Sequence, residues 1–190
     1  MVSPSTLLLE DQAAGAIRAT LAQGAALAVV SGSGLGVLRT LGREIAALPF
    51  SAIPGLGAGR VAGHAGLWSL LETDAGRLYC LTGRRHLYEG LDPAATGFAM
   101  RVLARLGVGR VILTNAAGAL SPRLSVGDLM LIRDHLNMMF CNPLSGRGEP
   151  GAQRDRVQNA PLSERVEREE IYDPAMNERL REAALAEAIA

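Results

Sequence analysis

Residues 25–41, AALAVVSGSGLGVLRTL, decide the fold of this chain. Residues 25–30 are a short apolar run typical of a buried strand, and residues 31–36 place three glycines directly after it. Residues 37–41 then return to a helical spacing of apolar side chains. A strand, a glycine turn and a helix in this order predict the opening of an α/β domain.

Further elements are predicted on both sides of this stretch. We expect strands at 68–72, 77–81, 108–114 and 129–132, and helices at 6–22, at 92–106 and from Asp173-Pro174 onward. The pattern predicts an α/β fold, a mostly parallel mixed sheet flanked by helices, in one domain over residues 1–190. Residues 49–60 and 142–168 are expected to be loops, the second of them mobile.

The composition of the chain disfavours several classes of function. The 190 residues are 48% hydrophobic and 20% charged with a net charge of zero, so we expect one globular domain without nucleic acid or membrane partners. No apolar run approaches the roughly 20 residues of a membrane-spanning helix, and the first residues lack a basic signal region, so a cytoplasmic location is expected.

All nineteen basic residues are arginine, which excludes a lysine-dependent phosphate loop and Schiff-base chemistry. Cys80 and Cys141 are far apart in the sequence, without the spacing of a metal site. They are interpreted as two buried or half-buried thiols rather than a bridge or a redox pair.

The glycine turn at residues 32–36 is the first candidate site. Its backbone N–H groups and the Ser33 hydroxyl can approach an anion closely. The alternative is a plain tight turn. A dinucleotide fingerprint is disfavoured because its third glycine would fall at Val37.

The second candidate lies at residues 83–90, GRRHLYEG. Arg84, His86 and Tyr88 are two apart and point to the same side of an extended chain, and Glu89 is close enough to orient His86. The alternative is a solvated loop with surface charges.

Two weaker candidates are residues 114–119, TNAAGA, and residues 63–66, GHAG. The small residues at 114–119 leave room for a flat ligand, or they are an ordinary exit from a strand. His64 at 63–66 closes over a site, or it is a lone histidine in a loop. His135 is interpreted as structural. Because three of these turns follow three strands, Ser33, Arg84 and His86 can converge on one anion.

Five blocks in this order and spacing resemble the trimeric class of purine nucleoside phosphorylases. They are residues 32–36 (GSGLG), 63–66 (GHAG), 83–90 (GRRHLYEG), 114–118 (TNAAG) and 127–135 (GDLMLIRDH). The resemblance covers residues 25–145 well, and residues 172–189 less closely.

The resemblance implies roles for particular residues. Ser33, His64, Arg84, His86 and the backbone N–H of Ala116 would hold inorganic phosphate, with Arg84, His86 and Glu89 as the catalytic group. Tyr88 would contact the ribose and Ala117 would lie beside the base. The implied reaction is phosphorolysis of purine nucleosides and deoxynucleosides by a homotrimer, with no metal or organic cofactor.

Relatives in this family continue with further strands that contact the base, and those positions are absent here. We therefore expect a C-terminally shortened chain whose phosphorolysis is feeble or lost. The alternative is a non-catalytic paralogue that binds phosphate or a sugar phosphate. A dinucleotide-dependent oxidoreductase is a third, more distant reading.

Overall fold

The strand predicted at residues 25–30 lies inside a five-stranded sheet in the computed structural model, which describes residues 4–22, 24–32, 34–57, 66–134, 172–187 and 189. These residues form two compact units, one ending at Ala116 and one comprising 117–134 and 172–189. The predicted loop at 142–168 lies outside the described residues, as does Cys141.

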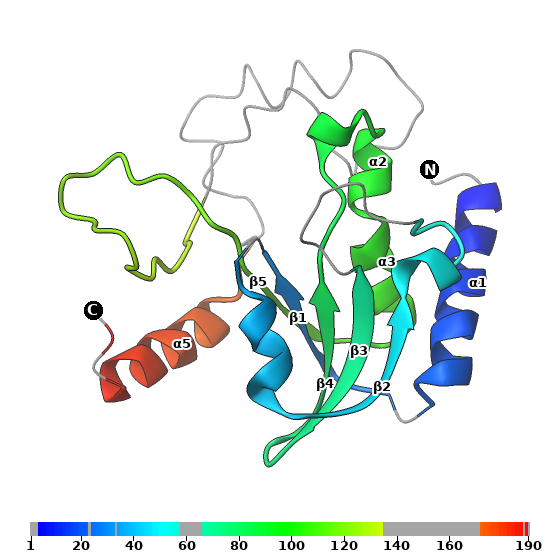
Figure 1. The fold of residues 1–190 in the computed structure, drawn as a ribbon, viewed down its shortest axis with the longest axis horizontal. Helices are drawn as coiled ribbons and strands as arrows, with labels where there is room; N and C mark the ends of the chain where they lie inside the picture. The colour runs from blue at the N-terminus through cyan, green and yellow to red at the C-terminus, as the bar shows by residue number, and fades with distance from the viewer. Residues whose placement is uncertain are drawn as a thin grey trace. The chain divides into compact units, whose positions relative to one another are not determined.

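The sheet belongs to the first unit (Figure 1), and its strand order is β2-β3-β4-β1-β5. Strand β1 is parallel to both β4 and β5, whereas β3 is antiparallel to β2 and β4. The sheet is therefore mixed, with the parallel strands on one side of it. The bounds are β1 Leu27–Ser31, β2 Arg43–Pro49, β3 Leu67–Thr73, β4 Gly76–Thr82 and β5 Arg110–Leu113.

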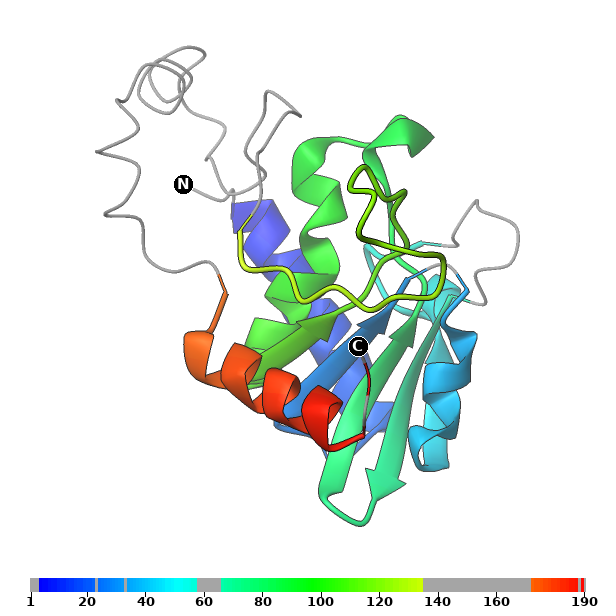
Figure 2. The same cartoon turned by 90° about the vertical axis from the view of Figure 1, so that its left-hand side faces the viewer.

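Different helices pack on the two faces of the sheet (Figure 2). Helices α1 (Pro4–Thr20) and α3 (Phe98–Arg105) pack on one face, where Trp68 and Tyr79 are completely buried. The 3-10 helix η1 (Gly36–Leu41) lies against the other face through Leu38, over a smaller cluster that includes Cys80. Alternating side chains of β1, β3, β4 and β5 supply both clusters, as the period of two requires.

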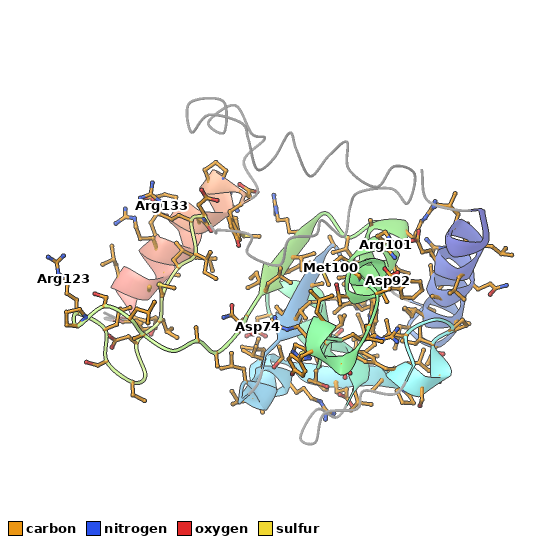
Figure 3. The ribbon with its side chains drawn as sticks, turned by 90° about the horizontal axis from the view of Figure 1, so that it is seen from above. Asp74, Asp92, Met100, Arg101, Arg123 and Arg133 are labelled. Carbon is orange, nitrogen blue, oxygen red and sulfur yellow. The ribbon has the colours of Figure 1, made fainter. Side chains whose placement is uncertain are left out.

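Charged side chains join the helices of the larger cluster. Glu10 of α1 is 3% exposed, and its carboxylate lies 2.6 Å from Nε of Arg101 on α3 (Figure 3) and 3.6 Å from Nε of Arg105. The Glu10 charge is thus compensated at the α1–α3 contact.

The predicted helix at 92–106 is formed in two pieces, α2 (Pro93–Thr96) and α3, with Gly97 between them. The predicted strand pair around residues 74–76 is confirmed as β3 and β4. Strand β2 was not predicted, because its sequence begins with the charged pair Arg43-Glu44 and has no clean alternation. Short 3-10 helices complete this unit at η2 (Phe50–Ala52) and η3 (Leu87–Glu89).

The second unit contains α5 (Pro174–Ala186), whose predicted start is confirmed. The Asp173 carboxylate caps it by accepting hydrogen bonds from the N–H groups of Ala175 and Met176, at 2.9 and 3.1 Å. Arg123 and Arg133 are exposed on this unit (Figure 3).

The strand predicted at 129–132 is wrong. These residues form no ladder with any described strand, and Leu129 and Met130 are 67% and 63% exposed. An apolar run becomes a strand only where a neighbouring strand takes up its backbone hydrogen bonds, and none of the described strands does so here. Within the described ranges, no helix is long and apolar enough to cross a bilayer.

Candidate oxyanion site

Three loops meet at one edge of the sheet because β4, β1 and β5 are adjacent and parallel, so their carboxyl ends point the same way. Residues 83–90 follow β4, residues 32–36 follow β1, and residues 114–116 follow β5. Each loop is held to another by a specific contact.

The first contact joins the loops after β1 and β5. The backbone N–H of Gly32 donates to Oγ1 of Thr114 at 2.9 Å, and the same hydroxyl donates to the carbonyl of Val30 at 3.1 Å. A Cβ at position 32 would lie 2.5 Å from the Thr114 carbonyl oxygen and 2.8 Å from Cα of Asn115. Only glycine permits this approach.

The second contact brings in the loop after β4. Gly83 has φ +114°, a conformation that favours glycine, and it turns the chain from β4 toward Arg84. The half-buried Arg84 guanidinium donates from Nη1 to the Thr114 carbonyl at 3.2 Å and from Nε to Nε2 of His86 at 3.4 Å. Arg84 therefore links two of the loops with one side chain.

His86 is held by Glu89. Oε1 of Glu89 lies 3.0 Å from Nδ1 of His86 and accepts a hydrogen bond from the His86 backbone N–H at 2.7 Å. A carboxylate can only accept, so this contact assigns the proton to Nδ1. In the neutral ring this leaves Nε2 as the acceptor of the hydrogen bond from Nε of Arg84. In the charged ring Nε2 carries a proton, which it can donate to an anion but not to Arg84.

Tyr88 covers the imidazole. Its ring stacks on His86 with centroids 4.6 Å apart and an angle of 16° between planes, and its side chain is 75% exposed. An exposed aromatic ring next to the Arg84–His86 pair offers a flat apolar surface to a ligand.

Arg85 serves a different purpose from its neighbour. Its Nη1 donates to the Gly55 carbonyl at 3.0 Å. A Cβ at Gly55 would lie 2.7 Å from atoms of Leu9 and Phe98, so this turn sits directly on the α1–α3 side of the core. Arg85 thereby fastens the loop after β4 to the core.

The remaining predicted residues fall in three places. Ser33 and His64 lie outside the described residues, as does His135. Ala116 is exposed, two residues after Thr114, and Ala117 is exposed in the second unit. From the sequence, Thr114 is included only as the first residue of the candidate segment 114–119, without a role of its own, and Arg85 is assigned no role.

Chemically, this arrangement suits an oxyanion. Arg84 supplies a planar set of N–H donors and His86 a ring nitrogen, next to the loop after β1 whose backbone N–H groups the sequence predicts as anion donors. Across the part of the chain that the structure describes, no three His, Cys, Asp or Glu side chains lie close enough to hold a metal ion.

Comparison with known proteins identifies the family of this chain. A family model described as the phosphorylase superfamily matches residues 26–190. A purine nucleoside phosphorylase of Rattus norvegicus is 38% identical over 146 residues, which are 75% of this chain and 50% of that protein. Purine nucleoside phosphorylase 1 of Bacillus subtilis is 37% identical over 139 residues, 73% of this chain and 51% of that protein. The chain spans about half the length of the curated relatives it matches.

Solved structures agree with this likeness. Purine nucleoside phosphorylase of Schistosoma mansoni, in complex with acetate, superposes with a TM-score of 0.57 at 28% identity, covering 64% of this chain and 44% of that one. A purine nucleoside phosphorylase in complex with ribose-1-phosphate gives a TM-score of 0.54 at 28% identity, covering 63% and 44%. The predicted α/β fold is confirmed by these neighbours.

Proposed function

Since the chain belongs to the phosphorylase superfamily, we propose that it binds inorganic phosphate at the Arg84–His86 site and takes part in the phosphorolysis of purine nucleosides. The observation that carries the proposal is the contact of Arg84 with both His86 and Thr114 at the meeting point of three loops. A guanidinium and an imidazole fixed side by side present several donors to one tetrahedral anion.

In the proposed reaction, a phosphate oxygen attacks C1′ of the nucleoside while the bond from C1′ to the base breaks. The bonding electrons leave with the purine, which gains the proton that hydrogen phosphate loses, and the products are ribose 1-phosphate and the free base. The sugar becomes positively charged in the transition state, so a phosphate anion held beside C1′ both stabilises and attacks it.

Each residue has a proposed task. Arg84 and His86, with Ser33, His64 and the N–H of Ala116, hold phosphate, and Glu89 fixes the ring of His86. Tyr88 is proposed to contact the ribose and Ala117 to lie beside the base. No metal or organic cofactor is needed for this chemistry. We further propose a homotrimer, a cytoplasmic location and a role in purine salvage, all of which rest on the family resemblance.

The substrates have support from named relatives. Solved purine nucleoside phosphorylases that resemble this chain include one in complex with ribose-1-phosphate and one from Schistosoma mansoni in complex with inosine, the second with a TM-score of 0.57 at 26% identity. Inosine and phosphate are therefore the substrates to test first.

The test has two measurements on the purified chain: phosphate binding by titration calorimetry, and hypoxanthine release from inosine with and without phosphate. Arg84→Ala should weaken phosphate binding roughly 10- to 100-fold, because it removes charge-assisted hydrogen bonds. Arg77→Ala, at the other end of the same strand, is the matched control and should bind as the wild type does.

Phosphate-dependent release of hypoxanthine supports phosphorolysis. Phosphate binding without turnover supports the alternative, a non-catalytic phosphate- or sugar-phosphate-binding protein. Equal phosphate affinity in the wild type and Arg84→Ala would show that the assigned site is wrong.

A further inference from the structure

Thr114 links the three loops of the site. Its hydroxyl accepts a hydrogen bond from the Gly32 N–H and donates one to the carbonyl of Val30, on the strand and loop of β1. Its own carbonyl accepts from Nη1 of Arg84, in the loop after β4. Thr114 itself begins the loop after β5.

These contacts set the distance between the loop after β1 and the Arg84 guanidinium, on which the proposed phosphate binding depends. The loops after β1 and β4 begin side by side, because Ser31 and Thr82 are paired in the sheet. Beyond those strand ends, the contacts with Thr114 join the two loops. Both are anchored on Thr114, one on its side chain and one on its backbone. Two hydrogen bonds, one accepted from Gly32 and one donated to Val30, fix the Thr114 hydroxyl, so the spacing is set before any ligand arrives.

The close approach of Gly32 strengthens this point. A Cβ there would lie 2.5 Å from the same Thr114 carbonyl oxygen that accepts from Arg84. The backbone after β1 therefore passes close to the oxygen that accepts from the guanidinium, with no room for a side chain between them.

We propose that Thr114 is a positioning residue that presets the separation of the β1-loop N–H groups and the Arg84 guanidinium for a tetrahedral oxyanion. This inference rests on the proposed phosphate site and adds a residue to it. Thr114 acts through Gly32 and Arg84 and need not touch phosphate itself. Its hydroxyl, rather than its methyl group, is the part that matters.

The test compares Thr114→Val, which keeps the shape and loses the hydroxyl, with Thr114→Ser, which keeps the hydroxyl. Thr114→Val should raise the Kd for phosphate about tenfold, the size expected when one buried donor loses its partner. Thr114→Ser should restore the wild-type value within about twofold. Thr73→Val is the matched control, because its hydroxyl donates to Gly76 at 2.8 Å at the opposite end of the sheet.

A purely structural role predicts a different pattern. In that case Thr114→Val and Thr73→Val would lower Tm alike, and neither would change the phosphate Kd of the folded protein. Equal phosphate affinity in wild type and Thr114→Val, in a protein where Arg84→Ala does weaken binding, would overturn the inference and leave the proposed function standing. A wild type that binds no phosphate would overturn both.

Amide exchange decides the matter if Thr114→Val does not fold. The Gly32 amide of the wild type should exchange slowly, and phosphate should slow it further by at least about threefold, since binding tightens the anchored loop. A Gly32 amide that exchanges freely, or that does not respond to bound phosphate, would overturn the positioning role.

Discussion

Glu89 contacts His86 through two hydrogen bonds: its Oε1 lies 3.0 Å from the imidazole Nδ1 and 2.7 Å from the backbone nitrogen of the same residue. The carboxylate is 7% exposed and the imidazole 17% exposed. One side chain thus fixes both the ring and the chain that carries it, and this relationship governs the first prediction.

Glu89→Gln should weaken phosphate binding about fivefold. The amide keeps the size of the carboxylate but replaces two charge-assisted contacts by neutral ones, which loses about 1 kcal/mol. Isothermal titration with phosphate measures the change. Glu72→Gln, at the far end of β3, serves as the control. An unchanged phosphate Kd in Glu89→Gln would show that the grip on His86 does not contribute to binding.

Arg85→Ala should separate the two neighbouring arginines. Arg85 donates to the Gly55 carbonyl and not to the site, so its loss should cost about 1 kcal/mol of stability and weaken phosphate binding much less than Arg84→Ala does. Urea unfolding and phosphate titration on both variants give the comparison. If the two variants lost phosphate affinity equally, Arg85 would belong to the binding site as well.

Thr82→Val should stabilise the protein by about 1 kcal/mol, measured by urea unfolding. Thr82 is 6% exposed, and its Oγ1 has no hydrogen-bond partner among the described residues. Valine has the same shape without the desolvated hydroxyl. The control is Thr73→Val, which removes a hydroxyl that does have a partner and should not stabilise. A loss of stability in Thr82→Val would reveal a partner for this hydroxyl.

Glu44 should make stability depend on pH in the acid range. Burial raises the pKa of this carboxyl, but hydrogen bonds from Arg39 and Ser69 outweigh it, so the pKa falls below its ordinary 4.5. A lowered folded-state pKa adds stability above pH 4.5, and that stability is lost as pH falls through the folded-state value.

The comparison is with Glu44→Gln, through Tm measured by circular dichroism across the acid range. The wild type should exceed the variant in Tm near neutral pH, and the gap should shrink as the Glu44 carboxylate protonates. A gap that stays constant from neutral pH to about pH 3 would contradict the assignment.

Arg101→Met should destabilise the protein by about 2 kcal/mol, because it removes the nearer of the two arginines that compensate the buried Glu10 carboxylate and leaves Arg105 at 3.6 Å. The double variant Glu10→Leu with Arg101→Met should recover much of that loss, since it removes both charges together. Urea unfolding of these two variants and of Glu10→Leu alone completes the cycle. Equal destabilisation in Arg101→Met and the double variant would mean that lost packing, rather than the lost compensation of the Glu10 charge, is the cause.

The sequence by itself determined the local elements. Largely apolar stretches at 25–30 and 108–114 predicted β1 and β5, and a strand pair around the turn at 74–76 predicted β3 and β4. Asp173-Pro174 predicted the start of α5. It also predicted that Arg84 and His86 share a side of the chain, because alternation is a property of the extended backbone. These features depend only on near neighbours in sequence.

Only the tertiary structure decided which loops meet and through which atoms. The order β4-β1-β5 brings Thr114 against Gly32 and Arg84, residues 82 and 30 positions away in the chain. In the tertiary structure residues 43–49 also form an edge strand, whereas residues 129–132 form no strand. A strand forms only where another strand, often distant in the sequence, takes up its backbone hydrogen bonds. The local sequence pattern does not specify which strand that is.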